Sequence, residues 1–318
     1  MKKIVAFLLS LSSLYLYTAN LEPLEIIDII TNFSLDELCP TSKIIAETRS
    51  NVRCFFDFNT YITSCYSPDV KRIFFMNDVV SLSNLVILPD DIKKKLILFT
   101  WEPGGVNQAY ADFFSRVYTF NGTLVDQIKY FNFFYPVLTP LCSDLAKFED
   151  KKLCVMISQS PSPERIKIIT FFENKPEEDF EFYGHSQIIQ STRYRGSIPG
   201  HPLSQEKFSM LKKYRFCVCF ENSSINGYIT EKIFAGFAAG CVPIYWGAPN
   251  IKEYIPQECF IDYRNFQNDE ELYNFIKNMS EQTHQHYINN IRTFLLSEKA
   301  YLFSAEHFSE IIHDAIMH

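Results

Sequence analysis

The 318-residue sequence has few of the residues that mark fibrous, repetitive or disordered chains. It contains only 10 glycines and 15 prolines, which excludes collagen-like sequences, low-complexity repeats and flexible linkers. It also has no excess of positive charge, because a net charge of -7 argues against a general nucleic-acid-binding protein. What is present is a globular composition, with 47% hydrophobic residues and a length typical of about two domains.

Patterns typical of metal sites are also missing. No Cys-x-x-Cys pair stands near a second such pair or near a His-x-x-x-His, so zinc-site spacing is absent. There is no Asp-x-Asp, and the weak candidate that comes nearest is Asp57 with Asn59, which a turn explains equally well. We expect Cys217 and Cys219 to be small buried residues on one face of a strand. A disulfide among the remaining cysteines is open if the chain is secreted, and the candidates are Cys39, Cys54, Cys65, Cys142 and Cys154.

The N-terminus has the one extended apolar run, from Ile4 to Ala19 behind Lys2 and Lys3. This pattern predicts that residues 1–20 are a signal peptide or, since Tyr17 makes a poor cleavage site, an uncleaved signal anchor. The run is shorter than the roughly 20 apolar residues of a comfortable membrane span. We therefore expect a membrane-associated or secretory-pathway protein, Golgi-type in a eukaryote and in the membrane or envelope of a bacterium. Four glycosylation sequons would matter only in the eukaryotic case, at Asn32, Asn121, Asn222 and Asn278.

Strand and helix signals alternate along the second half of the chain. Leu96–Thr100 reads as a buried strand that ends in a sharp loop, and the polar stretch 143–152 is the expected domain boundary. Further on, we expect Ser162 and Thr230 to cap helices, and Gly240 to end the second of them. This alternation indicates a parallel sheet with covering helices, and the expected elements are strands at 117–120, 153–157, 216–220 and 242–245 and helices at 163–172, 231–239, 269–279, 280–296 and 307–317.

The densest polar cluster, 221–232, connects an expected strand to the helix that starts after Thr230. A helix N-terminus offers unpaired N–H groups and a positive dipole end, where the cation Lys232 is disfavoured unless an anion such as phosphate neutralises it. Glu231 could accept hydroxyl hydrogen bonds from a sugar or simply stabilise the first helical turn. From the residues alone, the cluster predicts a ligand that carries phosphate.

The stretch 214–262, YRFCVCFENSSINGYITEKIFAGFAAGCVPIYWGAPNIKEYIPQECFID, resembles the signature region of the α-1,3/4-fucosyltransferase family. The resemblance implies an α/β fold of GT-B architecture, with two Rossmann-like domains that face each other across a cleft. It implies an acceptor-binding domain over 21–147, a GDP-fucose-binding domain over 148–300 and a C-terminal helix over 301–318. It is moderate over 153–172 and 90–140 and nearly absent over 20–89.

The resemblance also implies roles for individual residues. Lys232 would contact the donor diphosphate, Glu231 would bind fucose or ribose hydroxyls, and Asn222 and Tyr228 would shape the nucleotide pocket. Arg165 matches the family's second phosphate-binding cation, although an exposed helix arginine is the ordinary alternative. Two cations on a leaving diphosphate stabilise the charge that a metal stabilises elsewhere. We therefore expect no required metal or cofactor, with stimulation by a divalent metal left open.

Glu102 follows the strand Leu96–Thr100 and resembles the family's catalytic glutamate. The family inverts the anomeric centre, which needs a general base to take the proton of the acceptor hydroxyl. Trp101 and Pro103 would raise the pKa of Glu102 by desolvation. The implied reaction moves L-fucose from GDP-fucose to O3 of N-acetylglucosamine or glucose in a glycoprotein, glycolipid or lipopolysaccharide. The alternative is an inactive glycan- or nucleotide-binding protein of the same fold.

Overall fold

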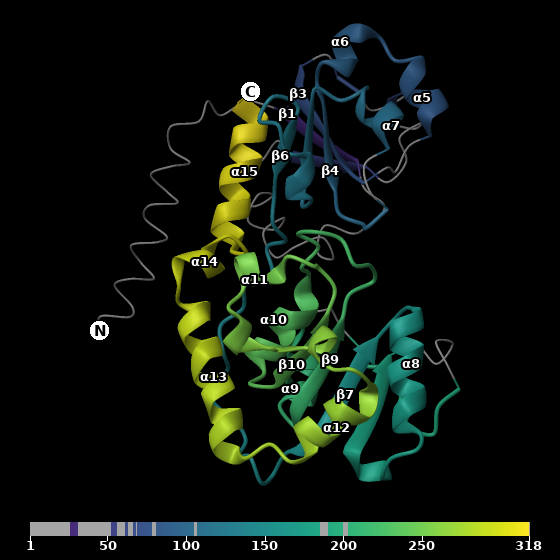
Figure 1. Cartoon of the computed structure of the whole chain (residues 1–318). Coiled ribbons are helices and arrows are strands. Elements are labelled where there is room, and N and C mark those ends of the chain that lie inside the picture. Colours follow the sequence, from purple (N-terminus) through teal and green to yellow (C-terminus); the bar gives the residue numbers. More distant parts are fainter. Residues whose placement is uncertain are drawn as a thin grey trace, which may run out of the picture. The chain divides into compact units, whose positions relative to one another are not determined.

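The structure of the chain is a computed structural model (Figure 1). It describes residues 26–30, 52–55, 61–62, 66–67, 69–77, 81–104, 107–184, 190–199 and 203–317. The predicted signal segment, Asn32, Asp57 and Asn59 lie outside the described residues. Within the described part of the chain, no helix is long and apolar enough to cross a membrane.

The chain folds as two compact units. The first contains residues up to 118 together with 128–131 and 312–318, and the second contains 119–127 and 132–311. The predicted boundary near 147 therefore falls inside the second unit. The segment 132–147 belongs there because its backbone is bonded to that unit, through Leu138 N to the Phe303 carbonyl at 2.8 Å and Cys142 N to the Ala238 carbonyl at 2.8 Å.

The first unit is built on a sheet of strand order β2-β1-β3-β4-β5-β6. Its pairs β1–β2, β1–β3 and β3–β4 are parallel. Every residue of β4 is buried, as expected for the apolar run LILFT, so the sheet carries the core of this unit. The strands and short helices are β1 (Ile26–Ile30), β2 (Val52–Phe55), β3 (Val70–Met76), α5 (Leu82–Val86), α6 (Asp90–Lys93), β4 (Leu96–Thr100), α7 (Gln108–Ala111), β5 (Arg116–Thr119) and β6 (Tyr130–Asn132). The 3₁₀ turn η2 (Gly122–Leu124), between the last two strands in the sequence, belongs to the second unit.

The second unit has a five-stranded sheet of order β11-β10-β9-β7-β8. All its pairs are parallel. If the strands of each sheet are numbered as they appear along the chain, the second sheet has the order 2-1-3-4-5 and the first has the same order with a sixth strand added. This is the doubly wound arrangement of nucleotide-binding α/β folds. The strands are β7 (Lys152–Ser158), β8 (Phe180–Gly184), β9 (Tyr214–Phe220), β10 (Val242–Trp246) and β11 (Ile261–Asp262).

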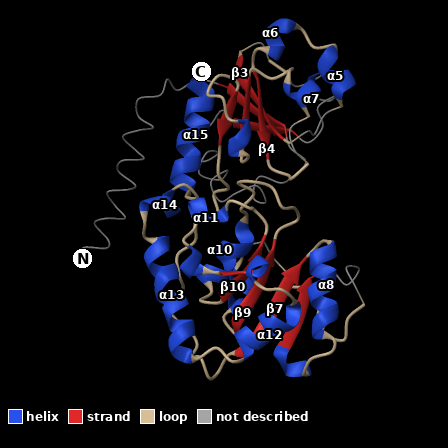
Figure 2. Ribbon diagram, viewed as in Figure 1, coloured by secondary structure: helices blue, strands red, loops and turns tan. Residues whose placement is uncertain are grey.

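Helices cover both faces of the second sheet (Figure 2). On one face α8 packs against α12, with the rings of Phe172 and Tyr273 6.1 Å apart. On the other face α10 packs against α13, with the rings of Phe237 and Phe294 6.0 Å apart. The helices are α8 (Pro163–Phe172), α9 (Gln205–Leu211), α10 (Glu231–Ala238), α11 (Ile251–Tyr254), α12 (Asp269–Lys277), α13 (Glu281–Leu295), α14 (Glu298–Tyr301) and α15 (Ala305–Met317), with 3₁₀ turns η3 (Glu177–Asp179), η4 (Gln257–Cys259) and η5 (Tyr263–Asn265).

Most of the expected elements of the second half are confirmed within two residues at each end, but one cap differs. Ser162 caps α8 by accepting the Arg165 N–H at 3.3 Å, as predicted. Thr230 makes no side-chain cap bond to α10, because its hydroxyl donates to the carboxylate of Glu221 instead. Gly240 ends α10 with a φ of +62°, as expected. Cys217 and Cys219 are buried thiols with their sulfurs 3.5 Å apart, and Cys142 and Cys154 are also thiols rather than disulfide partners.

Candidate active site

The predicted site residues of the second unit gather at the point where its strand order reverses. Strands β7 and β9 are neighbours, yet the chain leaves them toward helices on opposite faces of the sheet. In doubly wound sheets such a point leaves a crevice outside the carboxyl ends of the strands, where ligands bind. The loop 159–162 follows β7 and the loop 221–230 follows β9, so both loops border this crevice.

Arg165 joins these two loops. Its guanidinium donates to the Phe220 carbonyl at the end of β9, and at 3.0 Å to the Ser160 carbonyl. The side chain is 1% exposed, so the exposed-arginine alternative does not hold. Burial lowers the pKa of Arg165, and the charge of Glu221 opposes that change. In this structure the guanidinium has almost no surface for a direct phosphate contact, and its hydrogen bonds hold the carbonyls of Ser160 and Phe220.

Lys232 lies in the first turn of α10 and is paired with a buried acid. Its ammonium is 3.0 Å from the Glu221 carboxylate and 2.9 Å from the Thr230 hydroxyl. Glu221 is 0% exposed and also accepts the Thr230 N–H at 2.8 Å. Burial alone would lower the pKa of Lys232, but the charges of Glu221 and Glu231 outweigh it and raise that pKa. The cation is therefore neutralised inside the protein, which corrects the expectation that only a bound anion could balance it.

Glu231 opens α10 and stays ionised at acidic pH. Burial would raise the pKa of Glu231, but the charges of Lys232 and Lys207 outweigh it and hold that pKa at about 2. The ammonium of Lys232 is 3.4 Å from its carboxylate. Lys207 belongs to α9, which packs against α10, and burial lowers the pKa of this lysine. Two lysines and two glutamates thus surround the N-terminus of α10.

Asn222 and Tyr228 occupy different environments within the same loop. Asn222 is exposed and accepts a hydrogen bond from the Ser160 hydroxyl at 3.4 Å, which connects the two loops again. Tyr228 is buried, with its ring centroid 5.0 Å from that of Phe120. Gly227 precedes it with a φ of +77°, and a Cβ there would lie 2.0 Å from the Phe120 carbonyl oxygen. The loop conformation therefore requires glycine at this position.

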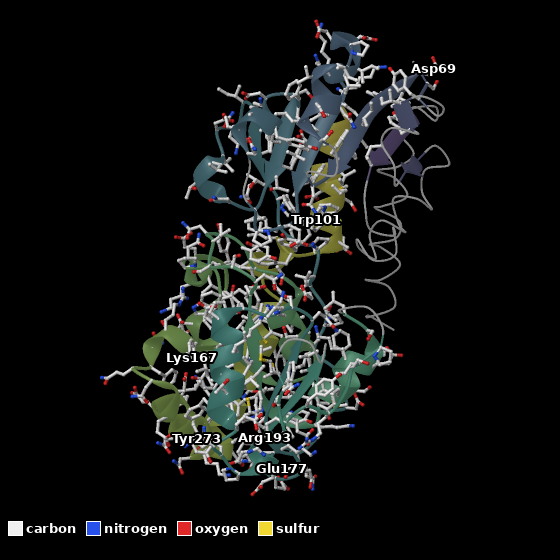
Figure 3. The ribbon with its side chains drawn as sticks, turned by 90° about the vertical axis from the view of Figure 1, so that its right-hand side faces the viewer. Asp69, Trp101, Lys167, Glu177, Arg193 and Tyr273 are labelled. Carbon is white, nitrogen blue, oxygen red and sulfur yellow. The ribbon has the colours of Figure 1, made fainter. Side chains whose placement is uncertain are left out.

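Glu102 belongs to the first unit, directly after β4. Its side chain is exposed, so the expected shielding by Trp101 and Pro103 is not found. The Trp101 ring is turned inward instead, and its indole N–H donates to the Met76 sulfur at 3.0 Å (Figure 3 labels Trp101). The backbone N–H groups of Trp101 and Glu102 both donate to the side-chain oxygen of Asn77, at 2.6 and 3.0 Å.

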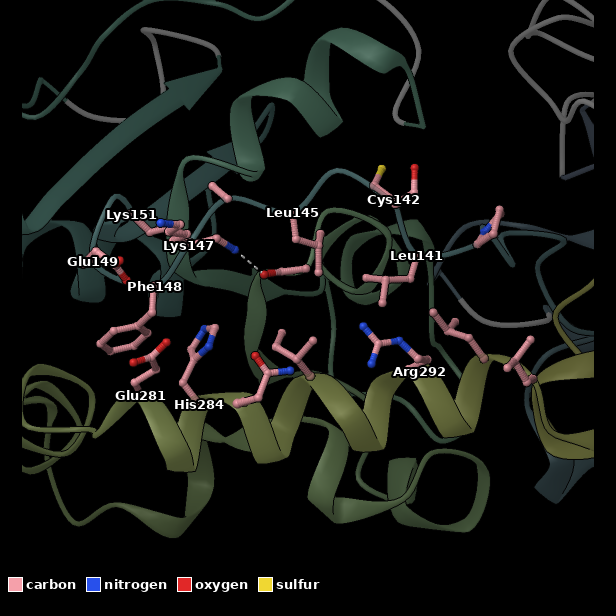
Figure 4. Close-up of a pocket in the computed structure, with 18 residues that line it drawn as sticks. Leu141, Cys142, Leu145, Lys147, Phe148, Glu149, Lys151, Glu281, His284 and Arg292 are labelled. Atoms are coloured by element: carbon pink, nitrogen blue, oxygen red, sulfur yellow. Dashed lines mark hydrogen bonds between the residues drawn. The ribbon is translucent and has the colours of Figure 1, made fainter.

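A large cavity lies elsewhere in the second unit. It has a volume of about 740 Å³ and is lined by the segment 140–151 and by α13 (Figure 4). None of the six predicted site residues lines it. At its wall, the Lys151 ammonium donates to the Gly240 carbonyl at 2.6 Å. In the described ranges, no group of three or more metal-ligating side chains occurs, and the predicted independence from metal is left untested by this.

Comparison with known proteins identifies the region that contains the crevice. Residues 147–299 match the C-terminal region of glycosyltransferase family 10, the fucosyltransferases. This region of the chain, residues 147–299, belongs to this family. The family 10 match covers both loops of the crevice, with Arg165, Glu221 and Lys232 inside it.

Named relatives agree with this assignment. The chain is 28% identical over 178 residues to the α-(1,3)-fucosyltransferase FucT of Helicobacter pylori, a match that covers 52% of this chain and 36% of that protein. It is 42% identical over 52 residues to the GDP-fucose protein O-fucosyltransferase 3 of Danio rerio, which is 16% of this chain and 11% of that protein. The chain thus spans only about a third or less of these relatives' length.

A solved α1,3-fucosyltransferase with GDP-fucose has the same fold. It superposes with a TM-score of 0.59 at 15% identity and covers 94% of this chain and 92% of its own. The chain therefore has the GT-B fold, as predicted, with both α/β units included in the match.

Sequence reasoning missed two charged residues of the crevice. Glu221 reads as the first residue of a loop, and only the folded loop shows its carboxylate under Thr230 and Lys232. Lys207 lies well before the motif, and the packing of α9 on α10 brings it near Glu231. The sequence did contain a signal for Glu221, because it comes directly after a buried strand, where a carboxylate usually needs a partner.

Proposed function

We propose that this chain is an inverting fucosyltransferase that moves L-fucose from GDP-fucose to a hydroxyl of an acceptor glycan. The observation that carries the proposal is the pair Arg165 and Lys232. Both cations lie in the first turn of a helix, where the helix dipole disfavours them, and both border the crevice between β7 and β9. Glu221 already offsets this cost at Lys232, and a bound diphosphate would add a further anion beside the two cations.

The donor side of the proposed reaction uses the second unit. Lys232, with the N–H groups at the start of α10, would bind the diphosphate and stabilise the charge that develops on it as the glycosidic bond breaks. Glu221 keeps the ammonium charged and fixes it at 3.0 Å from its own carboxylate. Glu231, ionised at neutral pH with a pKa of about 2, would accept hydrogen bonds from sugar hydroxyls.

Arg165 would stabilise the leaving diphosphate indirectly, by holding the two loops that border the crevice. Its hydrogen bonds to the Ser160 hydroxyl at 2.9 Å and to the Phe220 carbonyl hold both loops in place. Asn222 would contact the donor from the exposed side of the same loops. Its position in the crevice also makes glycosylation of its sequon incompatible with activity.

Glu102 would act as the general base. Its carboxylate would take the proton of the acceptor hydroxyl while that oxygen attacks the anomeric carbon of fucose from the face opposite the diphosphate. The bond between this carbon and the phosphate oxygen breaks in the same step, GDP leaves with the electron pair, and the α-fucoside forms from the β-linked donor. General-base catalysis of this kind contributes about 10²- to 10⁴-fold to the rate.

The proposal is tested first by donor binding and then by turnover. Calorimetry with GDP-fucose, GDP-mannose and UDP-galactose, with a chelator present, should show selective binding of GDP-fucose. Lys232→Ala should weaken that binding, whereas Glu102→Gln should keep it and lose turnover by about 10²-fold or more. Folded protein that binds no guanine nucleotide would overturn the donor assignment. Normal turnover in Glu102→Gln would overturn the general base.

For the acceptor and the cellular location we propose only a general class. We propose a sugar hydroxyl as acceptor, with O3 of N-acetylglucosamine or glucose as the first to test. The name of one matched relative, a protein O-fucosyltransferase, makes folded protein domains a necessary arm of the acceptor screen. We also propose membrane attachment through residues 1–20, which fractionation of the full chain against a chain lacking these residues would test.

A further inference from the structure

Asn77 stands at the end of β3 in an unusual backbone conformation. Its φ is +77°, and apart from glycine only Gln127 shares a positive φ in the described part of the chain. Asparagine tolerates this left-handed region better than most residues. The side chain is 7% exposed, and the backbone N–H of Asn77 donates to the Phe99 carbonyl at 2.7 Å. The backbone of Asn77 is thus fixed by its hydrogen bond to β4.

The side-chain oxygen of Asn77 accepts two backbone N–H groups from the neighbouring strand end. Trp101 N lies 2.6 Å away and Glu102 N lies 3.0 Å away. The pairing of β3 with β4 ends at Met76 and Phe99, so these two N–H groups lie beyond the strand ladder. Buried N–H groups without partners are costly, and a single amide oxygen here satisfies both. These two bonds also fix the orientation of the amide, because only its oxygen can accept.

These hydrogen bonds restrict the backbone of Glu102, whose side chain is exposed. An exposed carboxylate takes many positions unless its backbone is anchored, because side-chain torsions add to any backbone motion. The bond from Glu102 N to Asn77 removes the backbone part of that freedom. In an active site, a misplacement of about 1 Å can cost about 100-fold in rate.

We propose that Asn77 is a positioning residue for the general base, because its side-chain oxygen holds the backbone of Trp101 and Glu102 where β4 ends. The proposal rests on the role given to Glu102 under the proposed function. It predicts that Asn77 controls turnover and leaves donor binding unchanged, because the donor-binding residues belong to the second unit.

Two substitutions separate positioning from a merely structural role. Asn77→Gly keeps the positive φ without strain and deletes the oxygen. Asn77→Asp keeps an oxygen acceptor and adds a negative charge close to Glu102. The matched control is Gln127→Gly, at the other non-glycine residue with positive φ, which is exposed and lies in a loop.

The full chain would be assayed for kcat, KM for both substrates, the pH dependence of kcat, GDP-fucose affinity and hydrogen exchange of the 96–104 peptide. Asn77→Gly should lower kcat by about 10- to 100-fold, leave donor affinity within about twofold and speed exchange of that peptide. Asn77→Asp should keep exchange slow and move the acidic limb of the kcat profile upward by about half a pH unit, because a negative neighbour raises the pKa of a carboxyl. Gln127→Gly should change none of these.

Two results would overturn the proposal without touching the proposed function. One is wild-type kcat in Asn77→Gly while Glu102→Gln is inactive, and the other is an unchanged pH profile in Asn77→Asp. If the wild-type chain binds no GDP-fucose, the proposed function fails. Hydrogen exchange would still show whether the side-chain oxygen of Asn77 holds the end of β4. Unchanged exchange in Asn77→Gly would then show that the oxygen of Asn77 does not hold the strand end.

Discussion

Two buried arginines lie at the two ends of α8, and they differ in what the helix does for them. Arg193 donates to the carbonyls of Phe172, Glu173 and Lys175 at the C-terminal end, where the helix dipole favours a cation (Figure 3). Arg165 lies in the first turn, where the same dipole disfavours it, and burial lowers its pKa. The helix dipole therefore stabilises the charge of Arg193, whereas it destabilises the charge of Arg165.

This difference gives a physical criterion for function. A charged side chain whose surroundings stabilise it needs no further explanation, whereas one held against the local field indicates a ligand or a reaction. Lys232 also lies in the first turn of a helix, but Glu221 and Glu231 stabilise its charge and raise its pKa, so the criterion singles out Arg165. The following expectations test the criterion, in order of decreasing effect.

The largest effect is expected for Arg165→Met. Loss of this cation should lower kcat/KM for GDP-fucose by about 100- to 1,000-fold, as for the loss of one charge-stabilising donor in other active sites. Loss of its hydrogen bonds to the Phe220 and Ser160 carbonyls should also cost about 2 kcal/mol of unfolding free energy, as for Arg193, so the kinetics are measured per folded molecule. Lys167→Met is the control, since Lys167 lies on the same helix but is exposed and paired with Asp269. A loss of stability with normal kinetics would remove Arg165 from the site.

His284 is a buried titratable residue with no proposed role in the reaction, so its effect should fall on stability alone. Burial lowers its pKa to about 4, and its Nε2 lies 3.1 Å from the Arg215 carbonyl. The unfolded chain binds a proton at about pH 6.5 and the folded chain only near pH 4. Stability should therefore fall by up to about 3 kcal/mol as the pH drops through this window, and it should be constant above it. Denaturant unfolding between pH 4 and 8 measures this, and His284→Gln should remove most of the dependence.

Arg193→Met should have a smaller effect, on stability alone. Its loss leaves carbonyls at the end of α8 without a donor and should cost about 2 kcal/mol of unfolding free energy. The melting temperature should fall by about 5 °C. KM for GDP-fucose and the activity per folded molecule should stay at wild-type values. A kinetic defect larger than that of Arg165→Met would reverse the comparison between the two arginines.

Lys207→Ala should have the smallest effect, about tenfold weaker GDP-fucose binding. This lysine contributes its charge to the N-terminus of α10, where it helps to hold the pKa of Glu231 at about 2. Its removal should also raise the pKa of Glu231, which a carboxyl NMR titration can detect. Lys212→Ala is a suitable control, because Lys212 lies just after α9, the helix of Lys207, and pairs with Asp144 at 2.7 Å. Unchanged binding would limit the cations of the site to Arg165 and Lys232.

Elements with local signals could be predicted from the sequence. Ser162 followed by Pro163 marked the start of α8, and the uninterrupted apolar run of Leu96–Thr100 marked β4. The short strand β8 and the helix α9 were not predicted, because β8 is defined by its pairing with β7 and α9 by its packing on α10. Tertiary contacts of this kind leave no periodic pattern in the chain.

The same limit applies within the candidate site. The motif placed Lys232 and Glu231 at a helix start, and a local signal was enough for that. Thr230 was expected to cap the helix, but the buried carboxylate of Glu221 takes its hydroxyl as donor. The burial of Arg165 could not be predicted either, since it depends on the carbonyl of Phe220 from a strand 55 residues away.

The contact between Gly227 and the Phe120 carbonyl has a consequence for how the molecule could be divided. The segment that matches the family, 147–299, excludes Phe120 and Tyr135, which cover Tyr228. It also excludes Leu145, which packs so closely on Gly240 that an added Cβ there would lie 2.5 Å from the Leu145 side chain. The signature region is therefore not a portable module. An excised or transplanted second unit would need residues 119–127 and 132–311, because without them the aromatic side chains that pack against the loop 221–230 would be missing.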